Sequence, residues 1–184
     1  MQRLKFYGLG GQGVVTAAKV LSTAVSIYDG KNAITIPAYG HERRGAPVYT
    51  DVMVDEVPIK VNCYVYEPDI VLVMDDILPE KGVNVGEGKH EDTILVLNAS
   101  SRAIAEHYAE TYGFKEVWYV NATQVALDTI GRGIPNAAML GALAHTSVST
   151  IESVEIALKE FFGVKAGEIN AKAARNAYEQ TVKL

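Results

Sequence analysis

The chain has 184 residues, of which 48% are hydrophobic and 21% are charged, and its net charge is −5. These values are typical of one globular domain, here spanning residues 1–184, and the negative charge argues against a general nucleic-acid-binding protein, which needs a basic surface. No apolar run reaches the ~20 residues of a membrane span, no signal-peptide pattern opens the sequence, and the single cysteine, Cys63, can form no internal disulfide, so we expect a cytoplasmic protein.

The first elements surround a glycine-rich segment. Leu4–Tyr7 predicts a strand, and residues 14–28 predict a helix because their apolar side chains recur at helical spacing. Between them lies GLGGQG, residues 8–13, which also satisfies the dinucleotide pattern G-x-G-x-x-G. A strand, a glycine turn and a helix leave backbone N–H groups at the helix N-terminus, where the helix dipole favours an anion.

The residues after this helix argue against a nicotinamide or flavin nucleotide. Such a site needs an acidic residue ~20 positions on, at the end of the second strand. The second strand is predicted at residues 33–36 and runs into Pro37, whereas Asp29 precedes it and Glu42 lies well beyond it. Lys31 suits a phosphate better than a ribose. Three interpretations remain: a dinucleotide site, a tight turn without a ligand, and a site for another phosphate-bearing ligand.

A second glycine-bearing loop follows the second strand. In YGHERRGAPV, residues 39–48, Glu42, Arg43 and Arg44 lie between two glycines. Because ligands of open α/β sheets collect at the carboxyl ends of the strands, we expect this loop beside the first. The two arginines can bind carboxylate or phosphate, pair with Glu42, or form a solvated charge cluster. His41 can act as an acid or base, or simply as a polar surface residue.

The rest of the chain predicts alternating strands and helices. Residues 47–54 predict a half-exposed strand, with residues 59–61 pairing back on it as a β-hairpin. Further strands are predicted at 70–74, 93–97 and 116–120, a loop at 79–92, a helix at 102–112, and a helical C-terminal third from residue 122 with breaks at 131–135, near 149 and at 163. Ser149 and Glu152 match a capping box. The pattern predicts a Rossmann-like α/β fold with a mostly parallel sheet covered by helices.

Few residues suggest catalysis or metal binding. Asp75 and Asp76 end the strand at 70–74 and can either cap a helix or bind Mg²⁺. The histidines outside the second loop are scattered without ligand spacing, so we expect no zinc site. One cysteine cannot supply the four thiolates of an iron–sulfur cluster. We therefore expect no catalytic side chain and no metal on this chain.

The two loops together resemble a known family. GLGGQGVVTAAKVL and AYGHERRGAPV closely resemble the gamma subunits of the 2-oxoacid:ferredoxin oxidoreductases, most of all those of the pyruvate-oxidising enzymes. That family carries G-x-G-G-Q-G-V-x-T-A, then Y-G-x-E-x-R-G and an apolar strand ending in acidic residues. IPNAAMLGAL and EINAKAARNAYE resemble its later segments, so the resemblance covers nearly the whole chain. One departure is Ala46, where many relatives have a second glycine.

The resemblance implies a role within a larger enzyme. Members of the family oxidatively decarboxylate a 2-oxoacid with coenzyme A to acyl-CoA, CO₂ and reduced ferredoxin. Thiamine diphosphate and [4Fe–4S] clusters sit on companion alpha, beta and delta subunits, and the gamma unit is associated with coenzyme A. Carried onto this sequence, the resemblance assigns the coenzyme A contacts to the following residues: Gly10, Gly11, Gln12, Gly13, Lys31, Arg43 and Arg44. A purely structural assembly subunit and an independent NAD(P)- or flavin-binding oxidoreductase are the alternatives.

Overall fold

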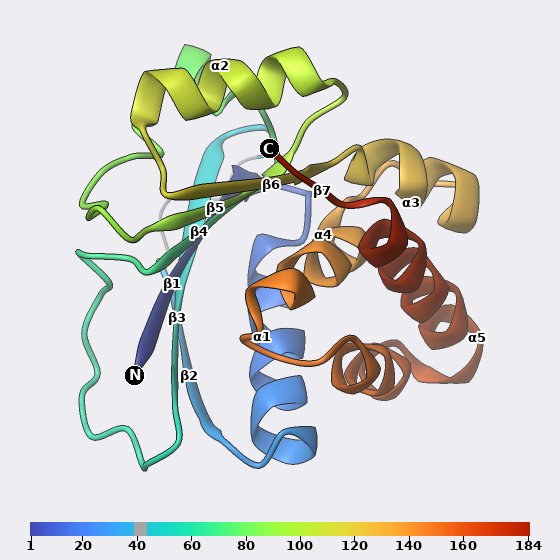
Figure 1. Cartoon of the computed structure of the whole chain (residues 1–184). Helices are drawn as coiled ribbons and strands as arrows, with labels where there is room; N and C mark the ends of the chain where they lie inside the picture. The colour runs from blue at the N-terminus through green and yellow to red at the C-terminus, as the bar shows by residue number, and fades with distance from the viewer. Residues whose placement is uncertain (39–43) are drawn as a thin grey trace.

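The computed structural model describes residues 1–38 and 44–184, which form one sheet with helices on both faces (Figure 1). The strands are β1 Gln2–Leu9, β2 Asn32–Pro37, β3 Pro47–Asp55, β4 Ile70–Val73, β5 Ile94–Asn98, β6 Glu116–Val120 and β7 Val182–Lys183. The helices are α1 Val14–Thr23, continued by the π-helical turn η1 Ala24–Tyr28, α2 Arg102–Tyr112, α3 Ala122–Ile130, α4 Asn136–Leu143 and α5 Ile151–Gln180, with short 3₁₀ turns η2 Leu78–Lys81 and η3 Ala144–Thr146.

The sheet has the strand order β2-β3-β1-β4-β5-β6-β7. Strands β1, β4, β5 and β6 pair in parallel, and β2 runs in the same direction because it is antiparallel to β3, which is antiparallel to β1. Among the strands of the described residues, only β3 and the short β7 run the other way. The predicted mostly parallel sheet is therefore confirmed. Strand β4 lies near its centre, and all four of its residues are buried, as its continuous apolar sequence predicts.

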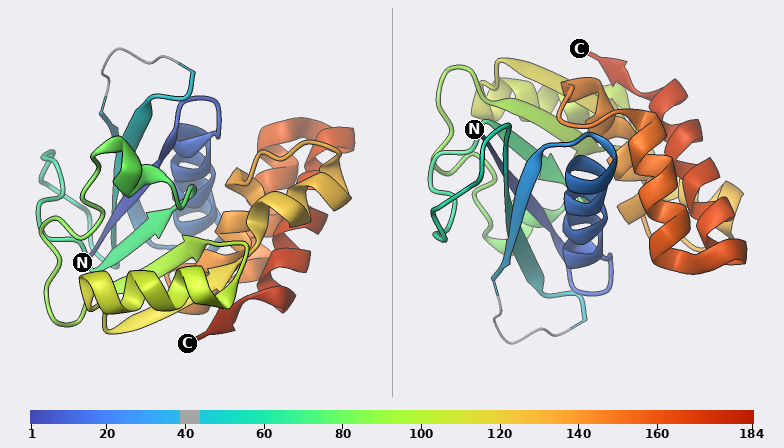
Figure 2. Two further views of the ribbon diagram at one scale, coloured as in Figure 1. Left: turned by 90° about the horizontal axis from the view of Figure 1, so that it is seen from above. Right: turned by 90° about the horizontal axis from the view of Figure 1, so that it is seen from below.

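Helices cover the two faces unequally. Figure 2 shows α1, α4 and α5 together on one side of the sheet and α2 on the other. The larger core lies on the side of α1, while the smaller core joins β4 and β5 to α2 and η2. No helix among the described residues combines the length and apolar composition that a membrane span requires.

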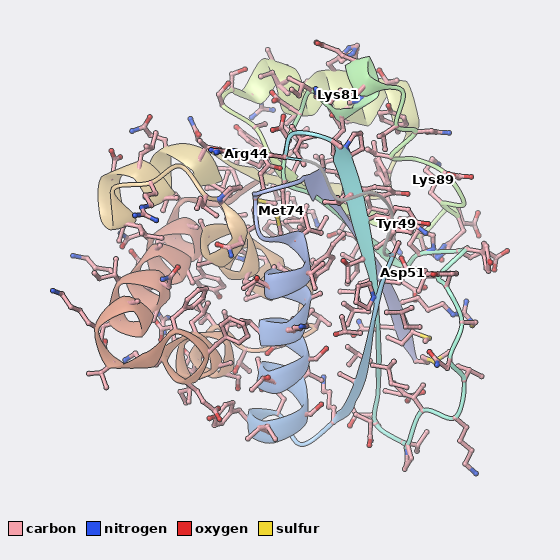
Figure 3. The ribbon with its side chains drawn as sticks, turned by 180° about the vertical axis from the view of Figure 1, so that it is seen from behind. Arg44, Tyr49, Asp51, Met74, Lys81 and Lys89 are labelled. Carbon is pink, nitrogen blue, oxygen red and sulfur yellow. The ribbon has the colours of Figure 1, made fainter. Side chains whose placement is uncertain are left out.

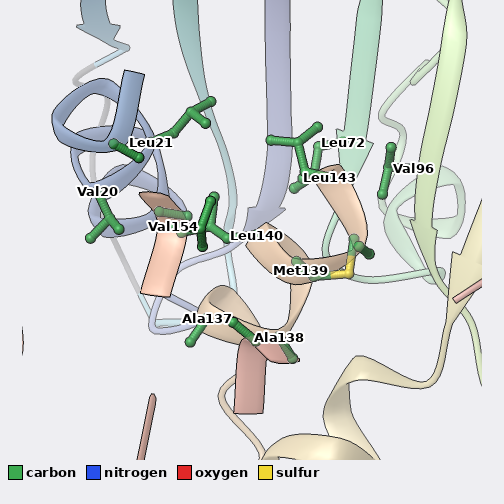
Figure 4. Packing of buried hydrophobic residues seen from close by; sticks show 14 of the residues in the cluster. Val20, Leu21, Leu72, Val96, Ala137, Ala138, Met139, Leu140, Leu143 and Val154 are labelled. Atoms are coloured by element: carbon green, nitrogen blue, oxygen red, sulfur yellow. The ribbon is translucent and has the colours of Figure 1, made fainter. Parts of the chain in front are cut away.

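Helix α4 occupies the centre of the larger core. All eight of its residues are buried. Met139, Leu140 and Leu143 belong to one apolar cluster with Leu21 of α1 and Leu72 of β4 (Figure 4). Because α4 is buried on every side, it needs no polar face, and its sequence is almost uniformly apolar.

Helix α5 packs against α4 at very short range. A Cβ atom at Gly141 of α4 would overlap the carbonyl oxygen of Ala174, so only glycine permits this approach. The backbone of α5 breaks at Gly163, as the sequence predicts, and its two halves lie side by side. Arg175 of the second half forms a two-pronged ion pair with Glu155 of the first half, with N–O distances of 2.8 and 2.7 Å.

Two local predictions are wrong. Residues 59–61 form no strand, because both edges of β3 are already occupied by β1 and β2. The strand that pairs with β3 as its neighbour in sequence is β2, which precedes it, and not residues 59–61, which follow it. Ser149 is not the cap of α5: Thr150 holds that position and accepts a hydrogen bond from the N–H of Ser153. Ser149 instead donates to the carboxylate of Asp29, which binds it more strongly than a neutral backbone group would.

Candidate functional site

The glycine loop joins β1 to α1 at the carboxyl end of β1. Gly11 and Gly13 have positive φ angles of 99° and 79°. Gly13 directly precedes α1, and a Cβ atom there would overlap the side-chain amide of Asn136 at the start of α4. The left-handed backbone and the contact with Asn136 both require glycine at this position. The turn thereby places the N-terminus of α1 at the carboxyl end of β1.

The first turn of α1 presents backbone N–H donors at the carboxyl end of β1. The N–H groups of Val14, Val15 and Thr16 precede the first intrahelical bond, which Ala17 makes to the carbonyl of Gly13. A glycine cap has no side chain to accept from them. The N-terminus of α1 therefore combines outward N–H groups with the positive end of the helix dipole, an arrangement that favours an anion.

Gln12 braces the loop from inside. Its Oε1 accepts from the N–H of Leu9 at 2.8 Å, and its Nε2 donates to Oδ2 of Asp75 at 2.6 Å. Asp75 also accepts from the N–H of Ile77 at 3.1 Å. The bond between Gln12 and Asp75 ties the glycine loop to the end of β4. The sequence gives one signal for it, which is that an acidic residue ends the strand beside β1.

The second loop lies against the first, as predicted. The N–H of Gly10 donates to the carbonyl of Ala46 at 2.8 Å, and the N–H of Gly45 donates to the carbonyl of Gly10 at 3.0 Å. Arg44 lies over the glycine loop, with its Cγ 3.8 Å from the position of a Cβ at Gly11. Arg43, and with it His41 and Glu42, lies outside the described residues.

These two loops enclose a cavity of about 440 Å³, within the size range of small-molecule sites. Its floor is the glycine loop and the first turn of α1, and its other wall includes Arg44, Val48 and Tyr49. Gly10, Gly11 and Gly13 all line it, whereas the side chain of Gln12 is turned to Asp75. The cavity is therefore lined both by the cationic residue Arg44 and by the first turn of α1 with its free N–H groups.

Lys31 does not belong to this cavity. It precedes β2 at the other end of the sheet, where its Nζ lies 3.7 Å from a carboxylate oxygen of Glu56. The register of β2, β3 and β1 puts the start of β2 level with the start of β1. The eight residues of β1 separate the two ends by ~23 Å. The expectation that Lys31 stands near the glycine loop is therefore wrong.

Asp75 and Asp76 do not cap a helix. The turn that follows them, η2, begins after Ile77 and has no side-chain cap. Burial and the charge of Asp75 raise the pKa of Asp76. No cluster of three metal-ligating side chains occurs among residues 1–38 and 44–184.

The strand order differs from that of the common dinucleotide-binding fold. In that fold the second strand lies beside the first and carries the acid that binds the ribose. Here β3 separates β2 from β1, and β2 ends in Pro37 followed by Ala38. The features that hold a nicotinamide dinucleotide are therefore missing from this part of the described chain, although the glycine spacing satisfies the pattern.

Known proteins resemble this chain over almost its whole length. The family model described as pyruvate ferredoxin/flavodoxin oxidoreductase matches residues 3–180. The chain is 45% identical to the "Pyruvate/ketoisovalerate oxidoreductases common subunit gamma" of Pyrococcus abyssi, over 98% of this chain and 97% of that protein.

Two solved structures have the same fold. The crystal structure of the pyruvate oxidoreductase subunit PORC of Thermotoga maritima superposes with a TM-score of 0.83 at 32% identity, over 99% of this chain and 97% of that one. The 2-oxoglutarate:ferredoxin oxidoreductase of Magnetococcus marinus, solved with 2-oxoglutarate, coenzyme A and succinyl-CoA bound, matches with a TM-score of 0.70 at 16% identity, over 97% of this chain and 31% of that one. The matched length and the identity to full-length relatives show that the chain belongs to the pyruvate ferredoxin/flavodoxin oxidoreductase family.

Proposed function

We propose that the chain is the gamma subunit of a 2-oxoacid:ferredoxin oxidoreductase acting on pyruvate, and that its glycine-loop cavity binds the phosphates of coenzyme A. The observation that carries the proposal is the convergence of the α1 N-terminus and Arg44 on one cavity. The names of the Pyrococcus and Thermotoga relatives support the assignment to a multi-subunit enzyme that uses pyruvate.

In this enzyme the acyl group left by decarboxylation of the 2-oxoacid is joined to the thiol of coenzyme A, and electrons pass to ferredoxin. Thiamine diphosphate and iron–sulfur clusters supply the decarboxylation and electron-transfer chemistry on the companion alpha, beta and delta subunits. Cys63 is the single cysteine of this chain, which fits clusters held elsewhere.

The contribution of this chain is to position coenzyme A. Phosphates at the N-terminus of α1 accept from backbone N–H groups, and Arg44 adds a planar cation that can form two bonds to one phosphate. Anchoring the nucleotide end restricts the thiol to a small volume near the companion subunits. Such restriction lowers the barrier to acyl transfer without a reacting group on this chain.

The test is the substitution Arg44→Gln in the assembled enzyme. Loss of one charge-assisted bond, worth ~1.5–3 kcal/mol, predicts a rise of roughly tenfold or more in the KM for coenzyme A. The KM for pyruvate should stay unchanged, because the proposal places only coenzyme A in this cavity. Steady-state kinetics with each substrate varied in turn give both values.

Arg102→Gln is the matched control. Arg102 is exposed on α2 and pairs with Glu106 of the same helix. If Arg44→Gln changes the KM for coenzyme A no more than Arg102→Gln does, Arg44 does not hold the phosphates and this part of the proposal fails.

A further inference from the structure

A second cavity, of about 450 Å³, lies on the face of the sheet opposite α1. Four tyrosines line it, and we call it the tyrosine pocket: Tyr7 of β1, Tyr49 of β3, and Tyr64 and Tyr66 of the segment between β3 and β4. Tyr7 and Tyr49 are paired directly across the two strands, and their rings lie 6.3 Å apart with a tilt of 49°. Tyr66 is 74% exposed, so most of its ring is available to a ligand.

One wall of the tyrosine pocket is held by a buried ion pair. Lys5 of β1 and Asp51 of β3 lie opposite each other, with Nζ 3.4 Å from Oδ1. Lys5 donates to the carbonyl of Val65 at 2.7 Å, and the N–H of Val65 donates to Asp51 at 2.8 Å. Figure 3 shows Asp51 on the same side of β3 as Tyr49, as their two-residue spacing requires. Because both backbone groups of Val65 are bound, the tyrosine on each side of it is fixed, although residues 58–65 form no helix or strand.

Another wall comes from the loop between η2 and β5, which carries Glu87. The next residue, Gly88, has a positive φ of 72°, and a Cβ atom there would overlap the carbonyl oxygen of Tyr66. Only glycine therefore lets the loop approach the backbone of Tyr66 so closely. This approach brings Glu87 to the pocket, which it lines together with Tyr66.

The charges of the tyrosine pocket do not balance. Among the described lining residues Lys5 is the cation, and it is paired with Asp51 and lies 4.9 Å from the centre of the Tyr49 ring. Glu87 is the acid, and no ion pair joins it to another residue in the described part of the chain. Burial raises the pKa of Tyr7, and the negative charges of Glu87 and Asp51 raise it further. The pocket thus combines aromatic faces with an unbalanced negative charge.

We propose that the tyrosine pocket is a docking site for an arginine side chain of a companion subunit. A guanidinium group stacks on tyrosine faces and forms two hydrogen bonds with one carboxylate, so it matches both features of the pocket. Tyrosine and arginine are also the residues that contribute most often to the binding energy of protein interfaces. This inference rests on the part of the proposed function that makes the chain one subunit of a larger enzyme, and it is independent of the coenzyme A site.

The surface around the pocket favours a protein over a free small cation. Val57 and Val61 precede the two tyrosines on the same segment and are exposed as well. Val61, Tyr64 and Tyr66 line a neighbouring cavity of about 330 Å³, so the exposed apolar surface continues beyond the tyrosine pocket. A small cation leaves this surface in water, whereas a subunit buries it. A segment that is already held in place also loses little conformational entropy when a partner binds.

The test is competition for a place in the assembled enzyme. Wild-type and variant chains with different tags are produced in equal amounts with a limiting supply of companion subunits, and mass spectrometry gives the ratio of the two chains in the purified complex at equilibrium. Glu87→Gln loses a charge-assisted bond and should be depleted roughly tenfold or more relative to wild type. Glu110→Gln changes an exposed acid of α2 outside the pocket, and as the control it should be incorporated like wild type.

Variants of Tyr66 separate stacking from apolar packing. Tyr66→Phe keeps a ring and should be incorporated like wild type, whereas Tyr66→Leu keeps apolar bulk without a π-face and should be depleted about threefold or more. Because Tyr66 is exposed, neither change disturbs the core. If the two variants are incorporated equally, the pocket takes an apolar side chain and the assignment of arginine is wrong.

A photo-crosslinking amino acid placed at position 66 of the chain in the assembled enzyme identifies the occupant. The crosslinked peptide should come from a companion subunit and contain an arginine, and changing that arginine to glutamate should restore the incorporation of Glu87→Arg. A crosslink to a second copy of this chain, or to a peptide without arginine, overturns the inference. If the wild-type chain does not join the companion subunits, the proposed function fails; if it joins them and Glu87→Gln is incorporated equally, only this inference fails.

Discussion

The buried ion pair between Lys5 of β1 and Asp51 of β3, whose Nζ and Oδ1 atoms lie 3.4 Å apart, gives a quantitative test of how the segment around Val65 is held on the sheet. The substitution Lys5→Met removes the ammonium group but keeps a long apolar side chain. It leaves Asp51, which is fully buried, with only the N–H of Val65 as a donor. It also leaves the carbonyl of Val65 without its bond from Lys5.

We expect Lys5→Met to lower the free energy of unfolding by a large amount for a single substitution. Removing one partner of a buried pair costs ~3–5 kcal/mol, because the remaining charge stays desolvated. The Lys5 side chain is 14% exposed, which admits some water and favours the lower value of ~3 kcal/mol. With a urea m-value of ~2 kcal/mol per molar, the unfolding midpoint should fall by ~1.5 M.

The cost should depend on pH. Burial raises the pKa of Asp51 above its ordinary value, and the nearby charge of Lys5 opposes that rise. Without Lys5 the pKa in the folded state rises further, so the folded variant binds more protons than its unfolded chain at pH values above the unfolded pKa of 3.8. Its stability therefore falls as pH increases through the folded pKa. The difference in unfolding free energy between wild type and Lys5→Met should be smaller near pH 4 than at pH 7.

Urea unfolding of the full chain at both pH values measures these quantities. Lys115→Met is the control, since Lys115 forms an exposed ion pair with Asp92 at 2.6 Å. Exposed pairs contribute ~0–1 kcal/mol. If Lys5→Met costs no more than Lys115→Met at pH 7, or if its cost grows on acidification, the ion pair does not hold the segment around Val65 as we argue.

Two further predictions concern the glycine loop and its surroundings. Gly13→Ala should lower the free energy of unfolding by at least ~1 kcal/mol more than Gly30→Ala. Both glycines have positive φ, but a Cβ at Gly13 would overlap Asn136, whereas a Cβ at Gly30 meets nothing within 4 Å. Thermal or urea unfolding of the two variants measures the difference, and equal costs would refute the contact. Lys31→Gln should leave the KM for coenzyme A unchanged in the assembled enzyme, because Lys31 lies ~23 Å from the loop along the sheet; an increase comparable to that of Arg44→Gln would contradict this placement.

Elements with local signals were predictable from the sequence. Helix α2 begins after Ser101, whose side chain accepts from the N–H of Ile104, and ends at Gly113 in the left-handed conformation. Both signals are carried by residues next to the helix, so no distant contact was needed to place it. The break at residue 163 was likewise predictable, because the residue there is glycine. The structure confirms it with a positive φ of 75° at Gly163.

Two predictions were wrong because a residue or strand elsewhere in the chain made the expected contact unavailable. The alternation in residues 47–54 identified β3 but could not show which strands would occupy its two edges. The serine at 149 had the right type and spacing for a cap, yet Asp29, 120 residues earlier, binds its hydroxyl. In both cases two local arrangements were possible, and a contact formed by tertiary folding chose between them.

For the candidate site, the sequence by itself determined the chemistry of the loop. A strand, a glycine turn and a helix give backbone donors at a helix N-terminus whatever the rest of the chain does, because the first N–H groups of a helix have no partner within it. Only the tertiary structure decided which residues share that site. Strand direction and register brought Arg44 and Tyr49 to the glycine loop, moved Lys31 to the far end of the sheet, and turned Gln12 away to Asp75. Distances between side chains depend on pairing across the sheet, and spacing along the chain does not encode that pairing.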